Sequence, residues 1–167
     1  MKDLAIRPYR PADAAALAEI FYRAVREGAR SRYSDEQRRA WAPEQPDPQT
    51  WARRLEGLIT VVAVAGGRPV GFMSLRPDGY LDLAFVLPKA MGRGVADALY
   101  QDLVAEARQR GIVTLTTEAS HLARPFFLRQ GWRLVSANTV ARGDVKLMNF
   151  LMEYSLTPIF GPDADGP

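Results

Sequence analysis

One segment constrains the fold of this chain more than any other: the glycine-rich turn between Val86 and Ala96, where the hydrophobic pattern changes its period. Before it, short apolar runs (59–65, 70–75 and 80–86) are separated by turns that contain glycine. Such runs and turns are typical of an antiparallel meander. After it, apolar residues recur at helical spacing from Val95 to Ala107. A meander followed directly by an amphipathic helix indicates a mixed α/β domain.

The rest of the chain adds strands and helices on either side of this junction. Further strands are expected over 4–8, 112–117, 132–140 and 145–154, and further helices over 11–28, 34–43, 47–57 and 123–130. Ser34 begins a capping box, and Asp47 precedes a proline as a helix N-cap. We find no repeat and no linker. We therefore predict a single α/β (α+β) domain over residues 1–157, with a mixed, mostly antiparallel sheet of about seven strands, and a disordered tail over 158–167.

The composition narrows the classes of function. The 167 residues include no cysteine and one histidine, so disulfides, Cys-ligated zinc, iron–sulfur clusters and a thiol nucleophile are excluded, and no metal is expected. The net charge is +3, and acidic residues are interleaved with the arginines, so nucleic acid is not an expected partner despite the pI of 9.4. No apolar run reaches the roughly 20 residues that span a bilayer. The N-terminus also lacks the apolar stretch of a signal peptide, so we expect a cytoplasmic protein with no membrane partner.

The glycine-rich turn has the chemistry of an anion site. Gly92 and Gly94 allow the backbone to approach a ligand closely and allow successive N–H groups to converge. The helix N-terminus that follows adds partial positive charge and free donors, and Arg93 lies between the two glycines. The segment is neither a P-loop nor a complete dinucleotide fingerprint, because Gly-Lys-Ser/Thr is missing and Gly-x-Gly-x-x-Gly is incomplete. We expect it to bind a phosphate or pyrophosphate.

Two motifs resemble those of the GCN5-related N-acetyltransferases. The first is Val86-x-Pro88-x-x-x-Gly92-Arg93-Gly94-Val95-Ala96, which resembles that family's acetyl-CoA pyrophosphate loop, although Met91 stands where Gln or Arg is usual. The second runs from Ala123 to Trp132 and is similar to the family's Ala-x-x-Phe-Tyr-x-x-x-Gly-Phe. The order of elements matches over about residues 3–154. Details at 119–120, 126–127 and 149–153 look closest to the bacterial YafP-like branch.

The resemblance implies an acetyl-CoA-dependent N-acetyltransferase with helices on both faces of its sheet. It implies that the third meander strand separates from the strand after the long helix, that acetyl-CoA lies in the gap as cosubstrate, and that an amide polarises its carbonyl. A primary amine of a small molecule or peptide then attacks directly, since no cysteine is available for a covalent intermediate. The residues expected to bind the cosubstrate are Ala84, Phe85, Val86, Met91, Gly92, Arg93, Gly94, Val95, Ala96, Ser120, Phe126 and Phe127.

A base near the acetyl carbonyl is useful because an amine at neutral pH is mostly protonated. Along 80–86, alternation directs one set of side chains (Leu81, Leu83, Phe85) to the core and the other (Tyr80, Asp82, Ala84, Val86) to the cleft. We therefore expect Asp82 to be the catalytic base. His121 is the second candidate, because histidine ordinarily changes charge near neutral pH. Glu118, at the end of the opposite strand, is expected to form a salt bridge instead.

The proton donor to the leaving thiolate stays open. The family often uses a tyrosine at the position of Phe127, which has no hydroxyl, so the proton comes from water or from Tyr22, Tyr33, Tyr80 or Tyr154. Met91 and Phe127 together suggest the alternative function, a catalytically silent acetyl-CoA-binding module or sensor.

The acceptor amine is expected to meet the first helices and the loop around residues 28–50. The candidate substrate-binding residues are Tyr22, Tyr33, Trp41 and Tyr80, whose aromatic rings suit an aryl amine or the stem of an amino acid. Exposed strand edges near the C-terminus are compatible with a homodimer.

Overall fold

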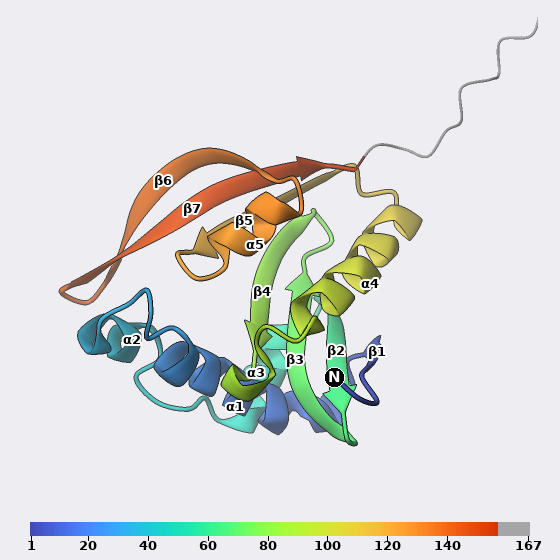
Figure 1. The fold of residues 1–167 in the computed structure, drawn as a ribbon, viewed down its shortest axis with the longest axis horizontal. Helices are drawn as coiled ribbons and strands as arrows, with labels where there is room; N and C mark the ends of the chain where they lie inside the picture. The colour runs from blue at the N-terminus through green and yellow to red at the C-terminus, as the bar shows by residue number, and fades with distance from the viewer. Residues whose placement is uncertain (157–167) are drawn as a thin grey trace, which may run out of the picture.

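The structure, a computed structural model, describes residues 1–156 and contains a single seven-stranded sheet with helices packed against it (Figure 1). The predicted tail over 158–167 lies outside the described residues. The strands are β1 (Ala5–Pro8), β2 (Ile59–Ala65), β3 (Arg68–Leu75), β4 (Tyr80–Val86), β5 (Thr114–Ser120), β6 (Arg133–Arg142) and β7 (Val145–Ser155). The α-helices are α1 (Ala14–Arg23), α2 (Asp35–Trp41), α3 (Pro48–Leu55), α4 (Val95–Gln109) and α5 (Arg124–Arg129).

The sheet has the order β1-β2-β3-β4-β5-β7-β6, and every neighbouring pair is antiparallel except β4 and β5. These two strands are parallel and pair at only two positions, Tyr80 with Thr116 and Leu81 with Thr117. Beyond these pairs β4 and β5 separate, so the sheet is split along the rest of β4. The expected separation of these strands is confirmed, and it gives the molecule an internal gap between two halves of one sheet.

Helices cover both faces of the sheet, as expected. On one face α4 packs so closely on β3 that a Cβ added at Gly71 would lie 3.1 Å from Val95 Cγ1. On the other face the neighbouring Phe72 contacts Trp51 of α3, with 6.3 Å between ring centroids. Successive residues of β3 thus face opposite helices, which follows from the period of two along a strand. Because both faces are covered, β3 is buried from Gly71 to Leu75.

The predicted caps fix the two short helices that border the gap. Ser34 Oγ accepts a hydrogen bond from the backbone N–H of Gln37 at 3.1 Å. The Asp47 carboxylate accepts from the N–H groups of Gln49 and Thr50, at 3.1 and 2.9 Å. These bonds satisfy donors that a helix start otherwise leaves free. They set where α2 and α3 begin, and so where each helix presents its tryptophan.

Most expected elements are shifted at their ends by one or two residues, and three differ more clearly. The helix predicted over 11–28 is divided into a 3₁₀ turn (Pro11–Asp13), α1 and a π-helical turn (Ala24–Gly28). Within the segment between Val86 and Ala96, a further 3₁₀ turn over Pro88–Ala90 precedes the two glycines. The strand predicted over 112–117 runs instead over 114–120, because β5 pairs with β7 residue by residue as far as Ser120 opposite Asn149. Glu118 therefore lies within a paired strand rather than at its end.

No helix among residues 1–156 is long and apolar enough to cross a membrane.

Candidate active site between the separated strands

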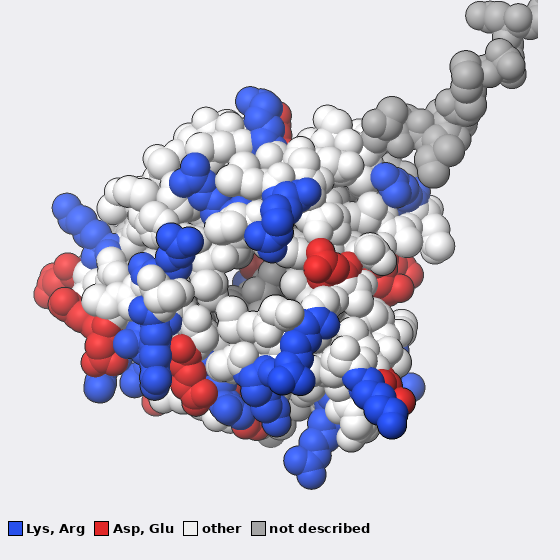
Figure 2. Space-filling model, viewed as in Figure 1, with Lys and Arg blue, Asp and Glu red and all other residues white. Residues whose placement is uncertain are grey.

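Two cavities meet where β4 and β5 separate. One has a volume of about 360 Å³ and the other about 330 Å³. Figure 2 shows a hollow in this part of the molecule, between α5 and the start of α4, with Lys and Arg side chains along its rim. The residues that line both cavities are Trp41, Ala84, Phe85, Ser120, Ala123 and Phe127. The two cavities are therefore adjacent, and they share a wall at the gap between β4 and β5.

The 330 Å³ cavity, here called the loop cavity, is bordered by the glycine-rich turn. Gly92 and Gly94 adopt left-handed backbone angles, with φ of +72° and +81°. A Cβ added at either one would meet no atom within 4 Å, so the side that a side chain would occupy is open. Within residues 1–156 Gly94 caps α4 without a side-chain hydrogen bond, which leaves the first amides of the helix without an acceptor. These residues fit the pyrophosphate of acetyl-CoA, because free N–H groups and the helix dipole favour an anion there.

Most of the predicted cosubstrate residues line the loop cavity. They are Ala84, Phe85, Val86, Met91, Gly92, Gly94, Val95, Ala96, Ser120, Phe126 and Phe127. Arg93 is exposed and is not among the described residues that line this cavity. Arg129 of α5 does line it, although we did not predict this residue from the sequence. Met91 lies with its Sδ against Gly28. Gln130 Nε2 donates to Asp97 Oδ1 at 2.8 Å, which joins α5 to the first turn of α4 at the edge of this cavity.

The point where the strands separate is fixed by Thr117. Its buried hydroxyl donates to the carbonyl of Leu81 at 2.8 Å. On the other side of β4, Ser74 lies opposite Leu83 but Leu75 lies opposite Leu81, so Asp82 is an extra residue in the pairing with β3. Such a bulge bends a strand and redirects its side chains.

The bulge interrupts the alternation predicted for β4. The Asp82 carboxylate contacts Arg54 of α3, with 2.6 Å between Oδ2 and Nη1. It therefore reaches toward α3, the helix on the Phe72 face, and does not follow the alternation of Ala84 and Val86. The strict alternation is wrong at this residue because the shift in register between β3 and β4 cannot be read from β4 alone. Asp82 still lines the 360 Å³ cavity, here called the acceptor cavity.

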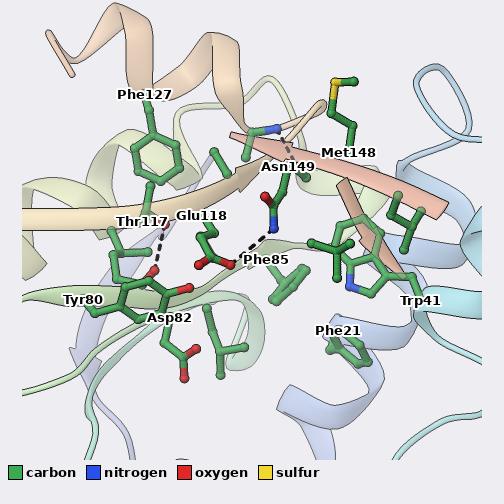
Figure 3. Close-up of a pocket in the computed structure, with 18 of the residues that line it drawn as sticks. Phe21, Trp41, Tyr80, Asp82, Phe85, Thr117, Glu118, Phe127, Met148 and Asn149 are labelled. Atoms are coloured by element: carbon green, nitrogen blue, oxygen red, sulfur yellow. Dashed lines mark hydrogen bonds between the residues drawn. The ribbon is translucent and has the colours of Figure 1, made fainter. Parts of the chain in front are cut away.

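Glu118 lies across the gap and also lines the acceptor cavity. Its Oε2 accepts a hydrogen bond from Asn149 Nδ2 at 3.3 Å (Figure 3). Among residues 1–156 it forms no ion pair. The expectation of a salt bridge at Glu118 is therefore wrong, because β7 places an uncharged amide beside it. Of the two carboxylates, Asp82 is the one that forms a salt bridge, with Arg54.

Tyr80 lines the same cavity from the start of β4. Burial raises the pKa of the Tyr80 phenol, and the charges of Glu118 and Asp82 raise it further. The phenol is therefore neutral at physiological pH and can donate a hydrogen bond. The Arg76 guanidinium lies over its ring, 4.9 Å from the centroid.

His121, the second candidate base, is not among the described residues that line either cavity. Its ring lies between Phe150 and Tyr33, with centroid distances of 4.8 and 5.7 Å. The Tyr33 hydroxyl accepts from the His121 backbone N–H at 2.7 Å and donates to the carbonyl of Met148 at 3.3 Å. Burial raises the pKa of Tyr33. These contacts join the segment before α2 to β7 and hold the imidazole in an aromatic cluster.

The acceptor cavity has an aromatic wall opposite the carboxylate. Phe21, Trp41 and Phe85 lie on one side in Figure 3, and Glu118 and Tyr80 lie on the other. The predicted Trp41 and Tyr33 belong to the lining, and Trp51 joins them.

The predicted Tyr22 is not among the described lining residues, and its ring lies 5.3 Å from the Arg26 guanidinium. Phe21, the residue before it, lines the acceptor cavity instead. This could have been predicted from the sequence, because Phe21 belongs to the apolar period of α1 and Tyr22 does not.

Comparison with known proteins agrees with this geometry. The family model of the acetyltransferase (GNAT) domain matches residues 29–153. The uncharacterized N-acetyltransferase YafP of Escherichia coli strain K12 is 38% identical over 154 residues, which is 92% of this chain and 97% of that protein. A GCN5-related N-acetyltransferase structure from Rhodopseudomonas palustris, described as "Aminotransferase, Class-II", has a TM-score of 0.85 and 39% identity, and the match covers 93% of this chain and 98% of that one.

A more distant structure shows the same fold with a ligand. The putative acetyltransferase yncA of Salmonella typhimurium, solved with its cofactor acetyl-CoA, has a TM-score of 0.71 at 21% identity, and the match covers 98% of this chain and 100% of that one. Together with the split sheet, the glycine cap of α4 and the matched domain, the two closer similarities show that this chain belongs to the GNAT family of N-acetyltransferases.

Proposed function

We propose that this protein transfers the acetyl group of acetyl-CoA directly to a primary amine of a small molecule or peptide. The observation that carries the proposal is the meeting of the two cavities at the gap between β4 and β5. The loop cavity has an anion-binding turn, and the acceptor cavity has carboxylates facing an aromatic wall. One side suits the cosubstrate and the other suits the amine.

The cosubstrate side supports acetyl-CoA by its chemistry. The turn from Met91 to Ala96 offers backbone donors to the pyrophosphate, and Arg129 adds a positive charge at the same cavity. The inner part of the cavity, lined by Ala84, Phe85 and Phe127, is apolar and suits the pantetheine arm. An amide of β4 beyond Leu81, where pairing with β5 has ended, would polarise the acetyl carbonyl.

Direct transfer is the proposed chemistry. The amine nitrogen attacks the carbonyl carbon, a C–N bond forms, and the C–S bond breaks to release the CoA thiolate. The chain has no cysteine that could hold the acetyl group. Phe127 is buried and has no proton to give, so water or the neutral phenol of Tyr80 is the proposed donor to the thiolate.

The test combines binding with transfer. Isothermal titration with acetyl-CoA measures occupancy of the loop cavity. Thiol release and mass spectrometry then follow acetylation of benzylamine, tyramine, spermidine, L-lysine and a dipeptide with a free amino group. We expect saturable binding and a mass increase of one acetyl group on at least one amine. Binding without transfer to any of them would favour the silent acetyl-CoA-binding module, and absence of binding would refute both functions.

A further inference from the structure

Two carboxylates border the point where β4 and β5 separate, and the structure distinguishes their roles. From their surroundings we infer that Glu118, rather than Asp82 or His121, accepts the proton of the attacking amine. This assignment rests on the proposed function, since it concerns the same acceptor cavity.

The topology places the two carboxylates symmetrically about this point. The last pairs between the strands are Tyr80 with Thr116 and Leu81 with Thr117. Asp82 is the next residue on β4, and Glu118 is the next residue on β5. Both line the acceptor cavity, so each is placed to meet an amine that reaches the gap. Position alone does not separate them.

Their partners do. The Asp82 carboxylate is 2.6 Å from the Arg54 guanidinium, and its side chain is only 15% exposed. An ammonium group would have to compete with that arginine for the same oxygens. Glu118 is exposed, and among residues 1–156 the only hydrogen-bond partner of its carboxylate is the neutral amide of Asn149. The uncompensated negative charge at the gap is therefore that of Glu118, and an ammonium group is drawn to it.

The other groups around the acceptor cavity agree with this division. The remaining titratable or charged side chains that line it are Tyr33, Arg54, Tyr80 and Arg142. The two tyrosines are neutral at pH 7, as phenols ordinarily are, and burial raises the pKa of each further. Arg54 is paired with Asp82, and Arg142 lies near the end of β6. None of these side chains accepts a proton at neutral pH, which leaves Glu118 for that step.

The step balances simply. The ammonium form of the substrate gives one proton to Glu118, and the free amine then attacks the acetyl carbon as described above. Glu118 returns this proton to solvent. The nitrogen loses its second proton to Glu118 or to solvent as the C–S bond breaks, and the thiolate takes one proton from solvent or from Tyr80, which solvent then reprotonates. Asn149 acts as a positioning residue because its amide holds the carboxylate from β7.

The test uses the amine of the panel that the unaltered protein acetylates fastest. We expect Glu118→Gln to lower kcat about 10²-fold at pH 7, within the usual range for general-base assistance. The deficit should shrink as the pH approaches that of amine deprotonation, because solvent then supplies the free base. The acetyl-CoA dissociation constant and the melting temperature should stay close to those of the unaltered protein, and Glu118→Asp should lose less activity.

Two comparison variants decide the assignment. Glu44→Gln removes an exposed carboxylate between α2 and α3, outside both cavities, and should leave the pH profile unchanged. Asp82→Asn should change KM for the amine by a factor that does not depend on pH. If Asp82→Asn or His121→Gln produces the pH-dependent loss and Glu118→Gln does not, the inference is overturned. If the unaltered protein binds acetyl-CoA but acetylates no amine of the panel, the proposed function fails and the assignment fails with it.

Discussion

The left-handed glycine at the start of α4 offers a matched experiment on the anion site. Gly94 precedes α4 and Gly111 follows it, with φ of +81° and +71°. A Cβ added at either residue would meet no atom within 4 Å. Gly94→Ala and Gly111→Ala therefore impose the same kind of backbone strain at opposite ends of one helix. They differ in one respect, since Gly94 lines the loop cavity and Gly111 does not.

The loss of stability from backbone strain and the loss of acetyl-CoA affinity can be distinguished by their expected sizes in the two variants. A left-handed conformation costs an L-residue about 1–2 kcal/mol, so both variants should lose stability by about that amount. For a domain of this size each kcal/mol corresponds to a drop of roughly 2–4 °C in melting temperature. Only Gly94→Ala places a methyl group where the pyrophosphate would approach the amides. Loss of one hydrogen bond to a charged group costs about 1.5–3 kcal/mol, so acetyl-CoA affinity should fall at least about tenfold.

The assay is isothermal titration of both folded variants with acetyl-CoA, beside thermal melts. We expect similar melting temperatures and a loss of affinity in Gly94→Ala alone. An unchanged dissociation constant in a folded Gly94→Ala protein would refute the assignment of this turn to the pyrophosphate. Equal losses of affinity in both variants would show that the effect comes from the helix as a whole.

Three further outcomes are expected. Met91→Ala should change acetyl-CoA affinity less than about threefold by titration, because the Met91 side chain packs on Gly28 and the anion site is made of backbone groups. Thr117→Val should lower the free energy of unfolding by about 1–3 kcal/mol in urea, since it leaves the buried Leu81 carbonyl without its donor. Asp13→Asn should lower the urea midpoint at pH 7. The hydrogen bond from Arg7 holds the pKa of Asp13 below its usual value, so the ionised carboxylate stabilises the folded protein at every pH above the pKa of the unfolded chain. Below about pH 4 the Asp13 carboxyl is protonated first in the unfolded chain, so its stabilisation of the folded protein declines and the midpoint of the unaltered protein should approach that of the variant. A constant difference down to pH 2 would contradict this.

Features encoded by neighbouring residues could be predicted from the sequence. The capping bonds of Ser34 and Asp47 join groups two or three residues apart, so their spacing was sufficient to place the starts of α2 and α3. The meander strands follow from apolar runs between glycine turns. Glycines directly before an amphipathic helix predict an anion site, and the structure brings all the predicted cosubstrate residues except Arg93 around one cavity. Their role in binding stays a prediction.

The acceptor side depended on contacts between distant segments. The partner of Asp82 was decided by a shift in register between β3 and β4 and by the placement of α3. Neither feature can be predicted from the residues of β4 alone. The freedom of Glu118 was decided by β7, which lies 31 residues further along the chain and supplies an amide rather than an arginine. The sequence by itself determined the fold class, the family resemblance and the glycine-rich turn before α4, because these rest on local spacing. Which of the two carboxylates has a charged partner was decided only by the tertiary structure, because charge compensation depends on what packing brings within a few ångströms.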